Sequence, residues 1–197
     1  MGEERPIRAT PVNEHEAIAL AARGDHHAFA WIIGEYKHMV HTASYRILRH
    51  REEAEEATQD TFVKAYQNLG GYQGGSKFST WLFSIAYRTA ISQLRKRREA
   101  TGSIDDLGAH EPTERETLAV EAGDRTAALT KALAQLPEED AAIVSFYYLE
   151  EMNVEEIVTV TGLGASNVKV KLHRCRKRLL EILQHELKEE AWTLIAD

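Results

Sequence analysis

The residues best suited to chemistry lie on one basic segment near the C-terminus. Between Ser166 and Leu180 the chain contains lysines and arginines but no acidic residue. Apolar residues recur through this segment at helical spacing and predict one buried stripe, made of Val168, Leu172, Cys175 and Leu179. The opposite side of such a helix presents polar and basic side chains to solvent. That arrangement suits DNA, because outward side chains can reach base edges while flanking cations meet phosphates.

A helical wheel centred on Val168 predicts which residues point outward. We call this set the recognition row: Ser166, Val170, His173 and Lys177, with Asn167 and Arg174 beside them. Four cations flank it, namely Lys169, Lys171, Arg176 and Arg178. The row is expected to contact bases and the flanking cations to contact phosphates. The alternative is a solvated basic helix with a favourable dipole and no ligand.

A second, shorter helix is predicted just before this one. Asn153 followed by Glu156 predicts a capping box at its start. Gly162 predicts its end, because glycine readily adopts the left-handed conformation that follows a last helical turn. The basic helix then begins near Gly164 or Ala165. Two helices joined by a glycine-bearing turn are typical of a helix-turn-helix.

The composition limits the class of protein. The formal net charge of the 197 residues is -7, which argues against non-specific coating of nucleic acid and favours positive charge kept in patches. One cysteine excludes a disulfide framework. The chain has neither a secretory leader nor an apolar run of about 18 residues, so no membrane insertion and a cytoplasmic location are expected.

The N-terminal half is predicted to be helical after a flexible tail over residues 1–12. Asn13 and Asp25 are the expected N-caps of a short helix and a long one, and a third helix is predicted over 51–69. His38 and His41 could share a face of the long helix, but no carboxylate or cysteine is spaced to complete a metal shell. No nucleophile with a base and no paired carboxylates emerge either, so we expect no metal, no cofactor and no enzyme.

A glycine-rich loop over residues 70–77 leads into a helix over about 79–98. The loop surrounds Tyr72 and Gln73 with glycines, and the helix ends in the four basic residues at 95–98. Aromatic rings beside a basic surface suit single-stranded DNA, because unstacked bases stack on rings while phosphates follow the cations. Trp81 is expected to pack in the core, and Phe78 is expected either in the core or at the DNA.

An acidic segment over 99–124 is predicted to be a linker, because it lacks apolar periodicity and contains proline and glycines. It separates a domain over 13–98 from one over 125–183, in which Pro137 opens a helix at a first-turn position. The tail over 184–197 ends in Trp192, Leu194 and Ile195, which are expected to fold back on the last helix or, alternatively, to form an exposed handle for a partner. The predicted fold class is therefore all-α, with two small helical domains joined by an acidic flexible linker, the C-terminal one a helix-turn-helix.

Four segments together resemble the extracytoplasmic-function (ECF) sigma factors of the sigma-70 superfamily of bacterial RNA polymerase. They are EEATQDTFVKAYQNL, KFSTWLFSIAYRTAISQLRKR, ALAQLPEED and VEEIVTVTGLGASNVKVKLHRCRKRL. The likeness extends from about Glu14 to Leu183. It implies an alternative sigma factor that binds core polymerase, melts a minus-ten element with the N-terminal domain and reads a minus-thirty-five element with the helix-turn-helix.

The resemblance also implies residue roles. Glu56, Gln59 and Asp60 match positions that dock on the β′ clamp helices of core polymerase, whose β subunit is a further expected partner. The set expected at the minus-ten element is Tyr72, Gln73, Lys77, Phe78, Arg88, Arg95 and Lys96. The set expected at the minus-thirty-five element is Ser166, Asn167, Lys169, Val170, Lys171, His173, Arg174 and Lys177. Promoter DNA is thus expected to be bound both as duplex and as single strand.

Some positions depart from the family pattern. Arg88 stands where many members carry an asparagine that helps to hold a flipped base, and an arginine favours backbone contact. Gly164 replaces a frequent capping serine, and Val170, often serine elsewhere, could contact a thymine methyl. Other readings are a stand-alone helix-turn-helix regulator, or a sigma-like adaptor recruited by another DNA-bound protein. An anti-sigma factor is a candidate partner by resemblance.

Overall fold

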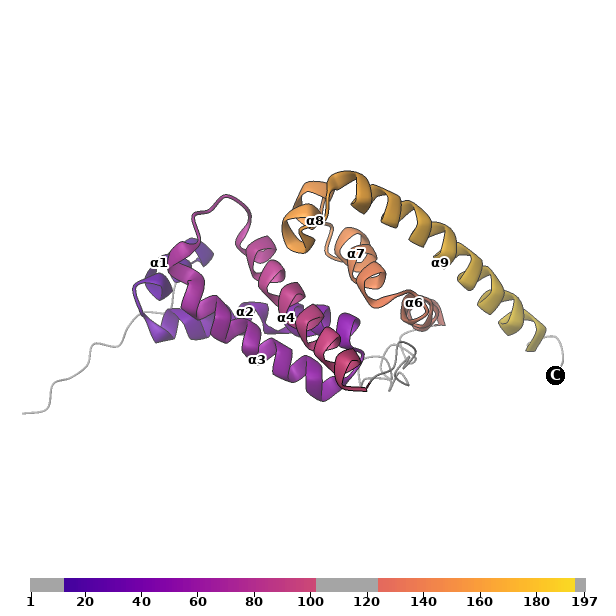
Figure 1. Ribbon diagram of the computed structural model, residues 1–197, viewed down its shortest axis with the longest axis horizontal. Helices are drawn as coiled ribbons and strands as arrows, with labels where there is room; N and C mark the ends of the chain where they lie inside the picture. Colours follow the sequence, from indigo (N-terminus) through magenta and orange to yellow (C-terminus); the bar gives the residue numbers. More distant parts are fainter. Residues whose placement is uncertain (1–12, 102–123, 194–197) are drawn as a thin grey trace, which may run out of the picture.

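The protein is all-α in the computed structural model, which describes residues 13–101 and 124–193 (Figure 1). The N-terminal helices are α1 (Glu14–Ala22), α2 (His26–Leu48), α3 (Arg51–Asn68), the 3-10 turn η1 (Leu69–Gly71) and α4 (Phe78–Thr101). The C-terminal helices are α6 (Asp124–Ala134), α7 (Glu138–Tyr148), α8 (Val154–Thr161) and α9 (Ala165–Thr193). The predicted fold class is confirmed, and the described ranges contain no strand.

Capping side chains start the first two helices where the sequence predicts them. The Asn13 side chain accepts a hydrogen bond from the Glu16 amide at 2.9 Å, and the Asp25 side chain accepts one from the His27 amide at 2.9 Å. These bonds satisfy amides that have no partner inside a helix. Arg49 ends α2 in the left-handed conformation, with a φ of 53°.

An apolar core holds α1, α2, α3 and α4 together. Its larger buried members are Phe29, Ile32, Val40, Phe62, Phe78 and Leu82. These residues recur at helical spacing within each segment, so each helix turns one apolar face inward. The long helices α2, α3 and α4 lie side by side as a result (Figure 1).

The C-terminal helices form the predicted helix-turn-helix. Asn153 and Glu156 make both hydrogen bonds of the capping box at the start of α8. Gly162 ends α8 with a φ of 74°, a conformation that glycine adopts without steric cost. The predicted buried stripe of α9 is confirmed, since Val168, Leu172 and Cys175 are 0%, 5% and 2% exposed. Pro137 was expected in the first turn of its helix, but it is the N-cap of α7 and so stands just before the first turn.

The two groups of helices share a second apolar core. Phe83 and Tyr87 of α4 pack edge-on against Phe146 of α7, and Ile157 and Val160 of α8 belong to the same cluster. Helix α8 accordingly lies against α4, its neighbour in Figure 1, and α7 contacts α2. The part of the chain between the two groups that the sequence predicts as a linker lies mostly outside the described residues.

The expectation that the C-terminal tail folds back is wrong as far as Thr193. Residues 184–193 continue α9 as one uninterrupted helix (Figure 1). The sequence there contains three Glu and no Gly or Pro, which favours helix continuation. Leu194 and Ile195 lie outside the described residues, as do residues 1–12.

Candidate nucleic-acid interface

The recognition row lies on the solvent side of α9. Ser166, Asn167, Val170, His173, Arg174 and Lys177 are all exposed, and so is the flanking Lys169. Val170 has a relative exposure of 62%. The buried stripe fixes this orientation, because any rotation of α9 that hid Val170 would expose Val168 and Leu172. The buried stripe therefore holds the recognition row on the solvent side of α9.

One flanking cation has a different environment from its neighbours. The Lys171 ammonium pairs with the carboxylate of Asp140, and the Lys171 side chain is only 18% exposed. Arg174 also donates to Asp140, with Nη2 and Oδ2 3.1 Å apart, yet its side chain remains 66% exposed. Lys171 therefore turns toward α7, whereas Arg174 reaches both Asp140 and solvent.

Asp140 itself was not singled out by the sequence. It is the third acidic residue in the first turn of α7, and only its packing against α9 distinguishes it from the two glutamates before it. Burial alone would raise the pKa of Asp140, but the hydrogen bonds and positive charges of Lys171 and Arg174 outweigh burial and lower it. Asp140 is thus a buried, ionised partner of the recognition helix.

The glycine-rich loop is supported by a group of aromatic rings. Tyr72 and Phe78 make an edge contact with ring centroids 5.4 Å apart, and Trp81 lies 5.4 Å from each of them. The Tyr72 hydroxyl donates to the Ser76 carbonyl at 2.7 Å and closes the loop on itself. Tyr72 and Trp81 are partly exposed, whereas Phe78 is 1% exposed. Phe78 belongs to the core in this structure and cannot meet a base without leaving it.

Other members of the expected minus-ten set lie at the surface. Gln73, Lys77, Arg88, Arg95 and Lys96 are exposed.

Two of these side chains have defined partners. Arg88 folds back on its own helix, where Nε donates to the Ser84 carbonyl at 2.8 Å and Nη2 to the Ser84 hydroxyl at 3.0 Å. Lys77 pairs with Glu156 of α8 at 3.0 Å. The Asn153 amide, and then Lys77, lower the pKa of Glu156. The loop and the helix-turn-helix are therefore in direct contact.

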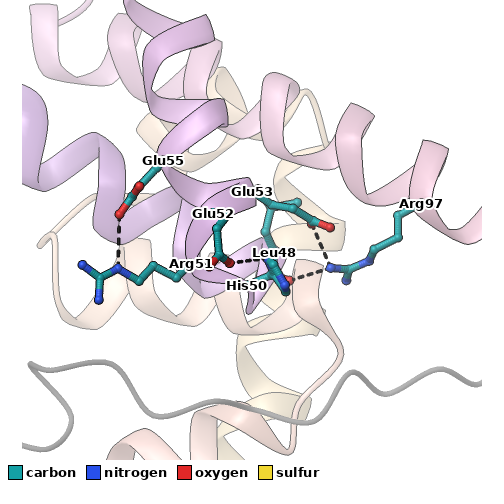
Figure 2. A network of polar contacts seen from close by, with 7 residues as sticks. All are labelled: Leu48, His50, Arg51, Glu52, Glu53, Glu55 and Arg97. Atoms are coloured by element: carbon teal, nitrogen blue, oxygen red, sulfur yellow. Dashed lines mark hydrogen bonds and ion pairs between the residues drawn. The ribbon is translucent and has the colours of Figure 1, made fainter.

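Some carboxylates on the acidic face of α3 pair with cations of the protein, and the others have no assigned structural role. Figure 2 shows Arg97 bridging the Glu53 carboxylate at 2.8 Å and the Leu48 carbonyl at 3.1 Å. The same view shows Arg51 with Glu55 and His50 with Glu52 (Figure 2). The two Arg97 contacts fasten the first turn of α3 to the ends of α2 and α4, whereas the other two are local to the start of α3.

The expected polymerase-binding residues lie further along α3. Glu56, Gln59 and Asp60 are all exposed, and Asp60 pairs with Lys64 at 3.9 Å.

Beside them lies a groove of about 510 Å³ between α2 and α3. The groove is lined by Gln59 together with largely apolar side chains, among them Phe29, Phe62, Val63 and Tyr66. Val63 is 56% exposed. The sequence pattern does not predict this groove, although Val63 follows the inner residue Phe62 and so falls off the buried face.

The described residues contain neither a cluster of metal ligands nor a membrane-spanning helix. Within 13–101 and 124–193, no three His, Cys, Asp or Glu side chains are grouped so that they could hold a metal ion. Across those same residues, no helix has the length and apolarity that crossing a bilayer requires. His41 stacks on Tyr45, and burial lowers the pKa of His41.

The chain matches two family models. The model for sigma-70 region 2 matches residues 32–100, and the model for sigma-70 region 4 matches residues 126–179. The first match contains α3, the glycine-rich loop and α4, and the second contains the helix-turn-helix.

Related proteins of known family support the same relationship. The chain is 30% identical to the RNA polymerase sigma-H factor of Pseudomonas aeruginosa, over 91% of this chain and 98% of the relative. It is 28% identical to the ECF RNA polymerase sigma factor SigW of Bacillus subtilis, over 85% of this chain and 95% of the relative.

Solved structures share the fold. CnrH in complex with the cytosolic domain of CnrY aligns with a TM-score of 0.62 and 24% identity, over 86% of this chain and 96% of CnrH. The sigma factor RpoE of Bartonella quintana, in complex with the anti-sigma factor NepR, aligns with a TM-score of 0.65 and 22% identity, over 79% and 96%. Taken with the family matches and the sequence relatives, these findings show that the chain belongs to the ECF sigma factors of the sigma-70 family, alternative sigma factors that direct transcription initiation.

Proposed function

We propose that this sigma factor reads a two-part promoter with the surfaces described above. The recognition row of α9 binds the minus-thirty-five element as duplex, and the glycine-rich loop with α4 binds the minus-ten element as a single strand. The observation that carries the proposal is the recognition row, an exposed face on a helix whose opposite face is fixed in the core. We place the division between the two reading domains in the segment 99–124.

On α9, the side chains divide by reach and chemistry. Val170, His173 and Arg174 lie centrally and contact base edges in the major groove, Val170 through a thymine methyl. Lys169 and Lys177 flank them and contact phosphates, with Ser166 and Asn167 at the helix start. Lys171 is the exception among the expected contacts, because its ammonium is already paired with buried Asp140.

In the N-terminal domain, Tyr72 offers a ring for base stacking, while Gln73, Lys77, Arg95 and Lys96 follow the backbone. Phe78 supports the loop from the core and is left out of the DNA surface. Arg88 is held on the surface of α4 by its hydrogen bond to Ser84. From there it contacts a phosphate and does not form a pocket for a flipped base.

Core polymerase binds the exposed part of α3. Glu56, Gln59 and Asp60 receive the β′ clamp helices, and the apolar groove that Gln59 borders continues the same surface. The β subunit is a further contact. An anti-sigma factor is also proposed as a partner, since two solved relatives of this fold are described in complex with such an inhibitor or a cytosolic domain.

The proposed activity is binding alone. Sigma factors are non-enzymatic regulators, and each residue named here acts by contact with DNA or polymerase. Each reader needs only modest affinity, because tethering two modules raises the effective concentration of the second contact. The chain works in the cytoplasm beside core polymerase.

The test is selection of promoter DNA by the reconstituted holoenzyme. Core polymerase and the purified chain are mixed with a random duplex library, and the bound DNA and the transcript starts are sequenced. We expect two motifs at fixed spacing upstream of defined starts. Replacing Val170 and His173 with alanine should alter only the upstream motif, whereas the exposed Lys131→Ala in α6 is the matched control. A single duplex motif bound equally well without polymerase would instead identify a stand-alone regulator.

A further inference from the structure

The contact between α7 and α9 at Asp140 joins a buried carboxylate to the DNA-reading face. The Asp140 side chain is 5% exposed and has partners on one helix: the ammonium of Lys171, the guanidinium of Arg174 and the thiol of Cys175. Residues 171 and 174 are three apart on a helix, so they lie on the same side of α9. A buried charge of this kind persists only when such donors satisfy it.

The two cations at this carboxylate differ in what remains available to DNA. The Lys171 ammonium lies against Asp140 and has little exposed surface. Arg174 uses Nη2 for the contact and keeps a 66% exposed side chain. A guanidinium carries five N–H donors, so one contact leaves enough donors for a two-bond contact to guanine. Lys171 is therefore the counter-charge of Asp140, and Arg174 is the one of the two cations that remains available to DNA.

Anchoring one end of Arg174 reduces the freedom of a long side chain. An unanchored arginine must lose its rotamer entropy when it binds a base, and the planar guanidinium must also be oriented in the base plane. The Asp140 contact orients the guanidinium before DNA arrives. The carboxylate is shielded from the phosphates, because it is buried and faces two cations.

We infer that Asp140 is a positioning residue for promoter recognition: it holds Arg174 in the orientation that reads one base of the upstream element, and Lys171 neutralises it without contacting DNA. This inference rests on the proposed function of α9 and goes beyond it. It assigns base preference at one promoter position to a residue that touches no DNA. It also removes one lysine of α9 from the phosphate contacts.

The test measures base preference rather than affinity. The holoenzyme carrying the full chain is titrated against duplexes in which each position of the selected upstream element is varied through all four bases. Arg174→Ala identifies the position that Arg174 reads, where preference should fall by about 5-fold to 150-fold, as expected for a bidentate contact. Asp140→Asn, which keeps the size and removes the charge, should lower preference at that same position by at least about fivefold. The preference is a ratio within one preparation, so partial unfolding cancels from it.

The matched variant is Lys171→Gln, which removes the other partner of Asp140 and leaves the Arg174 contact. It should retain the base preference of the wild type at every position. The double variant Asp140→Asn with Arg174→Ala should lose no more preference than Arg174→Ala alone, because the two residues act as one unit.

The outcomes separate the two levels of the argument. If Arg174→Ala changes preference at one position but Asp140→Asn lowers binding to all duplexes equally, Asp140 is only structural and the inference is overturned. If Lys171→Gln removes preference as strongly as Asp140→Asn, Lys171 contacts DNA and the assignment is wrong. If Arg174→Ala alters no position, Arg174 reads no base, and both its proposed role and this inference are overturned.

Discussion

Phe146 of α7 packs edge-to-face on Phe83 of α4, with ring centroids 5.4 Å apart and an interplanar angle of 69°. The two rings lie on either side of the division between the region 2 and region 4 matches. Four polar contacts surround this apolar centre, from Arg46 to Glu150, Arg49 to the Leu136 carbonyl, Lys77 to Glu156, and Arg98 to Glu138. The two domains are therefore held together by a packed interface as well as by the chain.

Truncating Phe146 should weaken the protein at this interface. Phe146→Ala removes a ring that is 2% exposed, and comparable substitutions cost about 3 to 5 kcal/mol of unfolding free energy. Urea denaturation followed by circular dichroism measures the change. The neighbouring Tyr148→Ala, whose side chain is 46% exposed, should change stability by less than about 1 kcal/mol. Equal effects of the two substitutions would show that the ring contact contributes nothing particular.

Replacing Gln59 and Asp60 together with alanine should abolish polymerase binding and leave the fold intact. Both side chains are exposed on α3, and Asp60 pairs within the same helix with Lys64 at 3.9 Å. Co-purification with core polymerase measures binding, and circular dichroism checks the helix content. Glu52→Gln is the matched control, because it alters another exposed side chain on α3 that pairs only locally with His50. Undiminished co-purification of the double variant would remove these residues from the docking surface.

Tyr72→Ala should impair promoter opening without altering upstream binding. The variant removes the ring proposed to stack on an unpaired base, a contact worth about 1 to 3 kcal/mol. Permanganate reactivity of unpaired thymines measures opening, and protection of the upstream element measures closed binding. Tyr72→Phe keeps the ring and loses only the hydroxyl bond to Ser76, so it should retain most of the opening. If both variants open DNA as the wild type does, Tyr72 is a loop-closing residue only.

Acid should remove the stabilising contribution of Asp140. Its folded pKa lies below its value in the unfolded chain, so the contribution is complete above about pH 4 and is lost as the pH falls through the folded pKa. The facing groups from α9 are Lys171, Arg174 and Cys175. Burial and then the Asp140 charge raise the pKa of Cys175 to about 11, far above this range.

The measurement is urea denaturation of the wild type and of Asp140→Asn between pH 7 and pH 3, a range chosen to cross the ordinary carboxyl pKa of about 4. The difference in unfolding free energy should stay constant at first and then shrink toward the acid end. Glu139→Gln, on the same turn but exposed, is the control. A difference that grows with acid would mean that Asp140 is not an ionised partner of α9.

The local features of the fold follow from short-range chemistry and were predictable. Asn153 and Glu156 form a capping box, and Gly162 ends α8. Both features were predictable because each depends only on residues within one helical turn. The buried stripe that includes Val168 and Cys175 follows from helical periodicity in the same way. The recognition row could thus be placed on the solvent side before any tertiary contact was known.

Features that depend on packing between distant helices were not predictable. The sequence left Phe78 open between the core and the DNA surface, and only the ring of Tyr36, which contacts it from α2, shows that it belongs to the core. Asp140 follows two glutamates in the first turn of α7 and differs from them because α9 covers it. The apolar residues of the tail were expected to fold back on the last helix, but α9 instead continues to Thr193.

Transcription in vitro tests the central claim most directly. Core polymerase is supplied with a promoter selected by the holoenzyme, and the 5′ ends of the transcripts are mapped with the wild-type chain, with the Gln59 and Asp60 double variant, and with no added chain. We predict one defined start that depends on the wild-type chain and disappears with the double variant. Transcription from that start without the chain, or none with it, would contradict the assignment of this chain as a promoter-reading sigma factor.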